Sequence, residues 1–68
     1  MNSKVEQKFH HNHLFDGLPS LNELERRYLL HILEVTKHHR SQAAEILGIN
    51  RRTLYRMADR FGIDLKED

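Results

Sequence analysis

The residues best suited to recognise another molecule are cations, hydroxyls and amides in the second half of the chain. Between Lys37 and Arg60 there are six basic residues and two acidic ones, a local charge of +4, although the whole chain carries only +1. Arginine pairs its N–H donors with phosphate or with the edge of guanine, and hydroxyl and amide groups bind phosphate oxygens. Positive charge concentrated in this way favours nucleic-acid binding.

Two short helices are expected to position these side chains. Ser41–Leu47 is small and apolar on one side, and Gly48 suits the left-handed position that follows a helix end. Asn50 can cap the amino end of the next helix, Arg51–Phe61. This second helix carries apolar residues at offsets 0, +3, +4 and +7, namely Leu54, Met57, Ala58 and Phe61. Two helices joined by a three-residue turn containing glycine predict a helix-turn-helix, in which Ala44 permits the close crossing.

We expect the second helix to enter the DNA major groove with its amino end leading. The side chains expected to reach bases are Arg51, Arg52, Tyr55 and Arg56. Those expected to hold the DNA backbone are His39, Arg40, Ser41, Asn50, Thr53 and Arg60. For Tyr55 the sequence leaves open an alternative role, in which the ring covers an edge of the core.

A longer first helix is predicted over residues 21–37, where Ser20 and Glu23 match a capping box. Its apolar residues form two arcs. The arc expected to face the domain contains Leu21, Leu24, Tyr28, Ile32 and Val35, and the second arc contains Leu29, Leu30 and Leu33. Only two short helices remain to cover this helix, so we expect the second arc to form a twofold homodimer interface. The alternative is that the amino-terminal segment covers these leucines.

Residues 1–18 show no sustained periodicity and are predicted to be a flexible arm or linker, which leaves residues 19–68 as the domain. His10, His11 and His13 lie in this arm without an acidic or thiol partner at ligand spacing, so neither metal nor cofactor is expected. A metal-sensing role would require metal-dependent binding or folding. The absence of cysteine and of a long apolar run fits a cytoplasmic protein with no membrane segment.

Enzymatic activity is not expected. The chain has no Ser/His/Asp or paired-carboxylate arrangement at catalytic spacing, and 68 residues are too few to enclose a deep active-site pocket.

From residue 18 to residue 63 the chain resembles the Fis-type DNA-binding domain at the carboxyl end of NtrC-family activators, most specifically at AAEILGINRRTLYR. These activators act on RNA polymerase carrying sigma-54. The resemblance implies an all-α fold of three or four helices that dimerises through a helical pair. It also implies a full-length parent with receiver and ATPase domains. Since the chain has no GxxxxGK[ST] phosphate loop, we expect an excised or terminal domain.

One departure from the family pattern is His38-His39, where the family commonly has Gly-Asn, so the loop geometry and a phosphate contact are in doubt.

The expected function is therefore sequence-specific binding of double-stranded DNA, by a dimer, at an inverted repeat. Two alternatives remain open: a stand-alone Fis-like nucleoid protein that bends DNA, and a helical oligomerisation module without DNA binding. The oligomerisation module predicts no salt-dependent affinity for DNA, whereas phosphate contacts predict a steep loss of affinity as salt rises.

Overall fold

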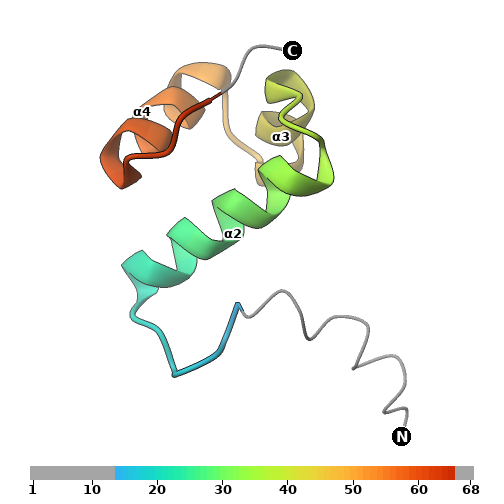
Figure 1. Ribbon diagram of the computed structural model, residues 1–68. Helices are drawn as coiled ribbons and strands as arrows, with labels where there is room; N and C mark the ends of the chain where they lie inside the picture. Colours follow the sequence, from blue (N-terminus) through green and yellow to red (C-terminus); the bar gives the residue numbers. More distant parts are fainter. Residues whose placement is uncertain (1–13, 66–68) are drawn as a thin grey trace, which may run out of the picture.

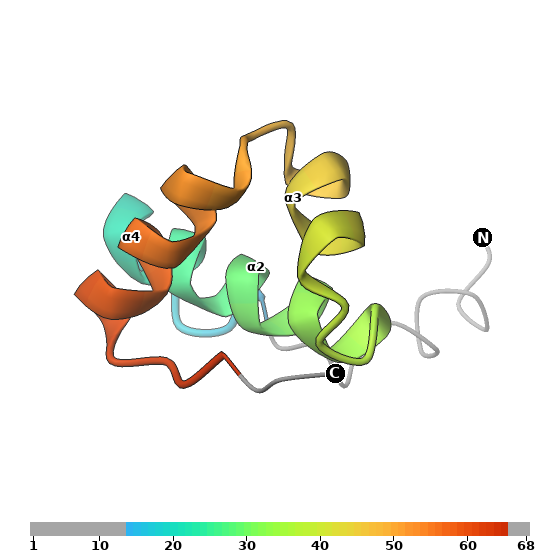
Figure 2. The same ribbon diagram turned by 90° about the horizontal axis from the view of Figure 1, so that it is seen from above.

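The computed structural model describes residues 14–65, which form three α-helices and no strand. Helix α2 is Leu21–Val35, α3 is Arg40–Leu47 and α4 is Arg51–Phe61. Both short helices lie on the same side of α2 (Figure 1), and the view from above shows α3 and α4 joined by a tight turn (Figure 2). The all-α helix-turn-helix fold expected from the sequence is confirmed.

Small and branched side chains from all three helices form the core. Its buried members are Leu29, Ile32, Leu33, Ala43, Ala44, Leu54 and Ala58. The two alanines of α3 let this helix approach both neighbours, because their side chains add little thickness at the crossing. Ala44 therefore occupies the small position that the tight turn requires. Each fully buried leucine contributes about 1.5–3 kcal/mol of transfer free energy, so Leu29, Leu33 and Leu54 are the main anchors of the fold.

The roles predicted for the two apolar faces of α2 are wrong: the face expected at a dimer interface packs largely inside the single chain. Leu29 and Leu33, expected at the dimer interface, are 0% and 1% exposed within the single chain. The reason is that α3 and α4 pack against this arc of α2, so neither side chain is accessible to a second copy. Leu30 is 38% exposed, so of this arc it alone is accessible to a second copy.

The arc of α2 that was expected to face the core is largely open to solvent. Of its residues only Ile32 is buried, whereas Leu21, Tyr28 and Val35 are exposed. Apolar periodicity placed Leu29 with Leu33 correctly, but it grouped Ile32 with residues that are exposed and Leu30 with residues that are buried.

All three helices end with the same pair of backbone hydrogen bonds. The residue with a positive φ donates its N–H to the carbonyl three residues earlier, and the next residue donates to the carbonyl five residues earlier. At α3 and α4 the positive φ belongs to Gly48 and Gly62, as predicted. At α2, which ends two residues earlier than expected, Lys37 takes the position with φ 55°, and His38 follows with φ 64°.

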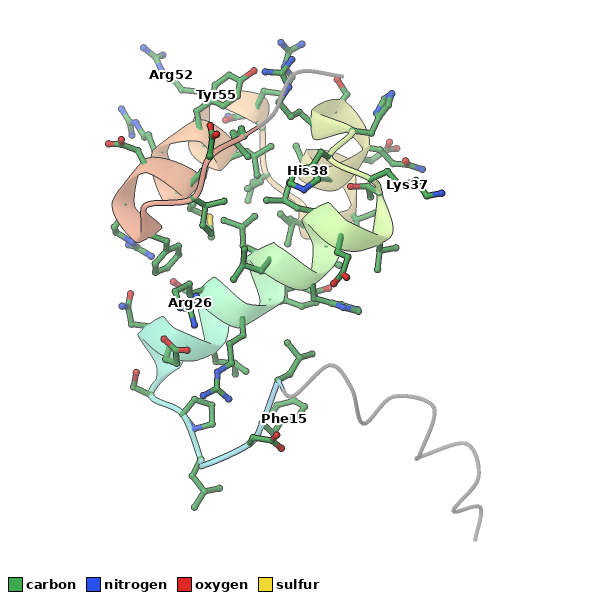
Figure 3. All side chains as sticks on the ribbon, viewed as in Figure 1. Phe15, Arg26, Lys37, His38, Arg52 and Tyr55 are labelled. Atoms are coloured by element: carbon green, nitrogen blue, oxygen red, sulfur yellow. The ribbon has the colours of Figure 1, made fainter. Side chains whose placement is uncertain are left out.

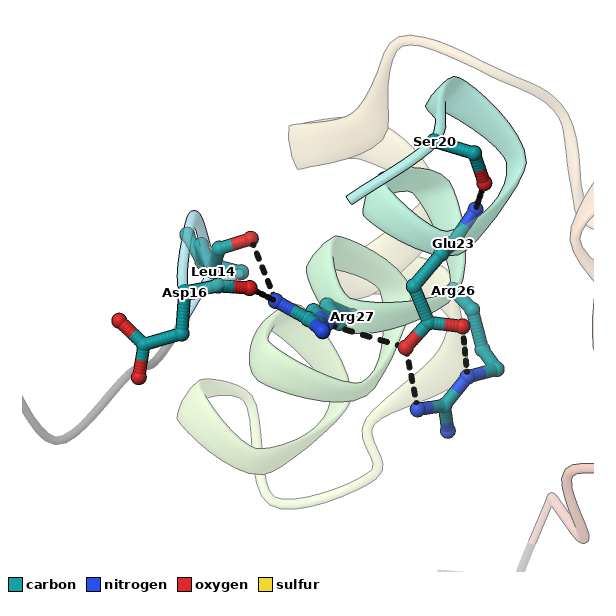
Figure 4. Close-up of polar contacts among 6 residues, drawn as sticks. All are labelled: Leu14, Asp16, Ser20, Glu23, Arg26 and Arg27. Carbon is teal, nitrogen blue, oxygen red and sulfur yellow. Dashed lines mark hydrogen bonds and ion pairs between the residues drawn. The ribbon is translucent and has the colours of Figure 1, made fainter. Parts of the chain in front are cut away.

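The turn before α2 is held against that helix by arginine. Ser20 Oγ accepts a hydrogen bond from the Glu23 N–H at 3.1 Å, which confirms the Ser20 half of the predicted capping box. The Glu23 carboxylate accepts from Arg26 at 2.7 Å and from Arg27 at 3.0 Å. Arg27 also donates to the carbonyls of Leu14 and Asp16, at 3.2 and 2.7 Å (Figure 4). The last part of the predicted arm is therefore in contact with α2; the histidines at 10, 11 and 13 lie outside the described residues.

Candidate nucleic-acid interface

The outward face of α4 is a basic surface. Leu54 and Ala58 are buried and fix the inner face, so Arg52 and Arg56, on the opposite side of the helix, are exposed. Figure 3 shows Arg52 and Tyr55 pointing away from α2. Among the described residues neither Arg52 nor Arg56 has an ion-pair partner, so both guanidinium groups are available to an anionic ligand.

The amino end of α4 is capped by Asn50, whose backbone is extended at φ −89° and ψ 170°. Its Oδ1 accepts a hydrogen bond from the Thr53 N–H at 2.8 Å. This bond satisfies one of the free amides of the first turn, and the remaining amides keep the positive end of the helix dipole. The same bond occupies the backbone donor of Thr53, so a DNA contact from Thr53 must come from its half-buried hydroxyl.

A cation–aromatic contact joins the start of α3 to α4. The Arg40 Cζ lies 5.8 Å from the centroid of the Tyr55 ring, close enough for a favourable interaction with the ring face. Tyr55 remains 38% exposed, so its ring both supports Arg40 and faces solvent. The structure thus brings together one predicted backbone contact and one predicted base contact.

The amino end of α3 has no side-chain cap. His39 takes the capping position with φ −80° and ψ 100°, but its side chain makes no hydrogen bond to the helix. The side chains of His39 and Ser41 are exposed. Their predicted contacts with phosphate are therefore sterically open, and like all the predicted DNA contacts they stay predictions.

Arg60 differs from the other arginines of α4. Its Nη2 lies 2.8 Å from Oε1 of Glu25 on α2, and its Cζ lies 4.6 Å from the Phe61 ring centroid. From the sequence, Arg60 is expected to contact phosphate, and Glu25 has no expected role. A partner 35 positions away in the chain leaves no local spacing signal, so only the fold reveals this pair.

The positive charge of α2 is compensated within that helix. Hydrogen bonds from Arg26 and then Arg27 lower the pKa of Glu23 to about 2, and the bond to Glu23 raises the pKa of Arg26. Glu23 is therefore ionised at neutral pH and offsets part of the arginine charge. The exposed Arg52 and Arg56, which have no ion-pair partner among the described residues, lie on the helix-turn-helix.

An apolar groove lies at the amino end of α2. It has a volume of about 270 Å³ and is lined by Leu14, Phe15, Leu21, Leu24, Glu25 and Tyr28. Phe15 is 71% exposed and Leu21 is 74% exposed. Figure 3 shows Phe15 at the opposite end of the molecule from Arg52, so the groove lies away from the amino-terminal part of the basic face; among the described residues, its Glu25 meets that face only at Arg60.

Within residues 14–65, no group of His, Asp and Glu side chains is arranged to hold a metal ion. No helix in this part of the chain is long and apolar enough to cross a membrane. The site consists of side-chain cations and helix ends, which are suited to bind an anionic ligand.

Comparison with known proteins identifies the family. The model of a family described as bacterial regulatory protein, Fis family, matches residues 20–63, a span that contains all three helices and more than half of the chain. No curated protein and no solved structure matches the chain. The chain therefore belongs to the Fis family of bacterial regulatory proteins, and its helix-turn-helix is a DNA-binding element of that family.

Proposed function

We propose that this domain binds double-stranded DNA sequence-specifically, as a homodimer on an inverted repeat, with α4 in the major groove. The observation that carries the proposal is the exposed face of α4, where Arg52 and Arg56, without an ion-pair partner in residues 14–65, stand opposite the buried Leu54 and Ala58. A helix fits the major groove, and an arginine there can bind guanine O6 and N7 together.

The position of each side chain on α4 supports a division of roles. Arg52 and Arg56 stand farthest from the core and are the main candidates for base contacts, with Arg51 and Tyr55 beside them. We assign phosphate contacts to residues at the start of each short helix, through helix amides and through polar side chains that are exposed or half-buried. This second set comprises His39, Arg40, Ser41, Asn50 and Thr53.

Replacement of Arg56 by alanine tests the base contact. A bidentate arginine–guanine pair is worth about 1–3 kcal/mol, so Arg56→Ala should weaken binding to a selected DNA site by about 5- to 150-fold. Affinity for random duplex should fall much less. Arg26→Ala is the matched control, because it removes the same charge from α2. Unchanged sequence selectivity in Arg56→Ala, measured by selection of bound sequences, would remove Arg56 from the recognition.

We also place the dimer contact in the apolar groove, in place of Leu29 and Leu33. The groove is apolar except for Glu25, and its exposed Phe15 and Leu21 would leave a large apolar patch in water if nothing covered them. A second copy related by a twofold axis would bury both grooves together. Because the groove is remote from Arg52, this arrangement leaves the amino-terminal part of the basic face of α4 free for DNA in both copies (Figure 3).

A pair of charged substitutions on α2 tests this location. Leu24→Glu, in the groove, should give monomers in sedimentation equilibrium and much weaker binding to an inverted repeat. Leu30→Glu is the control, because position 30 lies about 120° round the helix from position 24 at 100° per residue, away from the groove. It should remain dimeric. If Leu30→Glu separates the copies and Leu24→Glu does not, the interface lies on the Leu30 side.

The resemblance to NtrC-family activators supports a further proposal about context. We propose that the domain tethers an ATPase upstream of promoters that use sigma-54 RNA polymerase, in a parent that also carries a receiver domain. The coding DNA ahead of Met1 provides the test. An open reading frame that continues upstream through a GxxxxGK[ST] motif is expected. A start codon at Met1 with no frame upstream would favour the stand-alone Fis-like protein.

A further inference from the structure

The Glu25–Arg60 ion pair connects the recognition helix to α2. Arg60 follows Arg52 and Arg56 at intervals of four residues, so it continues the basic stripe of α4 toward the carboxyl end. Unlike them it is paired: its guanidinium lies 2.8 Å from the Glu25 carboxylate and rests near the Phe61 ring. Phe61 packs against the core, which keeps Arg60 on the flank of α4 beside α2.

We propose that Glu25 is an intramolecular competitor of DNA phosphate for Arg60. While Glu25 holds Arg60, one cation of the stripe is withheld from the DNA backbone. Both side chains are about half exposed, at 47% for Glu25 and 55% for Arg60, so the pair is accessible to exchange with phosphate. Phosphate contacts carry no sequence information. The competition therefore weakens the sequence-independent part of binding and leaves the base contacts of Arg52 and Arg56 unchanged.

The size of the effect follows from the strength of such pairs. An exposed ion pair changes an equilibrium by about two- to fivefold, and this is the affinity that Glu25 removes per subunit. Each additional phosphate contact makes the slope of log K against log salt steeper by about 0.9. A single carboxylate thus regulates both the affinity for DNA and its dependence on salt.

A double-mutant cycle between Glu25 and Arg60 tests the competition. Glu25→Gln, Arg60→Ala and the double variant are titrated by fluorescence anisotropy against the selected DNA site and against a random duplex of the same length, over a series of salt concentrations. Glu34→Gln is the matched control, since it removes one exposed negative charge from the same helix. Because Glu25 also lines the apolar groove, sedimentation at the same concentrations verifies that all variants share one oligomeric state.

Glu25→Gln should bind both duplexes about two- to fivefold more tightly per subunit, with a slope steeper by about 0.9 per subunit. The same substitution made in Arg60→Ala should change neither quantity, and Glu34→Gln should leave the slope unchanged. An equal gain in the Arg60→Ala background would overturn the proposal, as would a Glu25→Gln protein that binds no more tightly than wild type. The inference rests on the proposed function. If the proposed function itself is wrong, the result differs: the wild-type protein would bind neither duplex in a salt-dependent way.

Discussion

Replacement of Lys37 by glycine should stabilise the domain. Lys37 has φ 55° at the end of α2, where α3 and α4 each have a glycine in the equivalent position. The left-handed conformation costs a residue with a Cβ about 1–2 kcal/mol. Glycine avoids this cost but loses about 0.5–1 kcal/mol more backbone entropy on folding. The net expectation for Lys37→Gly is a gain of about 0.5–1 kcal/mol in the free energy of unfolding, since the Lys37 N–H that bonds to Glu34 is retained.

The reverse change at the end of α3 gives an independent estimate of the same quantity. A Cβ added at Gly48 would meet no heavy atom within 4 Å, so Gly48→Ala introduces no steric clash and tests backbone conformation alone. It should lose about 0.5–1 kcal/mol. Lys37→Ala is the control for lost charge and side-chain length. It keeps the Cβ, so its stability should lie within about 0.5 kcal/mol of wild type.

Urea unfolding followed by circular dichroism measures these differences at a single protein concentration, which matters if the folded state is dimeric. In a thermal scan, a change of 1 kcal/mol moves the Tm of a domain of this size by about 4–8 °C. A Lys37→Gly protein no more stable than Lys37→Ala would refute the reasoning, because both variants lack the lysine side chain and only one lacks the Cβ.

Three further predictions concern the core and the start of α2. Leu29→Ala should lower the free energy of unfolding by about 2–5 kcal/mol. Leu30→Ala should lower it clearly less, because the Leu30 side chain is 38% exposed. Equal losses of unfolding free energy, measured in urea, would contradict the assignment of the core. Glu23 has its pKa lowered from 4.5 to about 2, so the stability that it contributes is present above pH 4.5 and lost as the pH falls toward 2. Glu23→Gln should flatten that part of the pH dependence of Tm, and an unchanged profile would argue against the Arg26 and Arg27 contacts. Ala44→Leu should destabilise the domain by about 1–3 kcal/mol and weaken DNA binding, since a larger side chain forces α3 away from α4. Wild-type affinity for DNA in this variant would show that the helix crossing accommodates a larger side chain.

Local signals in the sequence predicted the helix-turn-helix closely. Gly48 and Gly62 have the left-handed backbone expected of them, and Asn50 and Ser20 cap the helices that follow them. Each of these features depends on residues within five positions of one another, so their physics can be read from a short stretch of sequence. The same locality explains why the bounds of α4 were predicted without error.

The faces of α2 could not be assigned from periodicity. Spacing shows that Leu29 and Leu33 share one arc and that Leu21 and Tyr28 share another, but both arcs are apolar. Which of them meets α3 and α4 depends on the direction in which the chain turns after Val35. That direction is set by the left-handed backbone at Lys37, a conformation that its residue type disfavours and that its sequence gives little reason to expect.

The contacts of Glu25 and Arg27 were also beyond prediction. Glu25 meets Arg60 across 35 positions, and Arg27 binds carbonyl oxygens of residues 14 and 16. Every residue has a backbone carbonyl, so the sequence does not show which carbonyl an arginine binds. Two charges so far apart along the chain could each have found other partners. Long-range polar contacts of this kind follow from the fold and could not be used to derive it.

The cap at Asn50 uses only the oxygen of the amide, which leaves the NH₂ group with no part in starting α4. Aspartate has the same shape and caps helices equally well, but it would place a full negative charge where phosphate is expected to approach. Exchanging nitrogen for oxygen in this one side chain would thus leave the fold intact while repelling the nucleic acid. A protein that starts its recognition helix with an amide rather than an acid meets the needs of folding and of an anionic ligand with a single uncharged group.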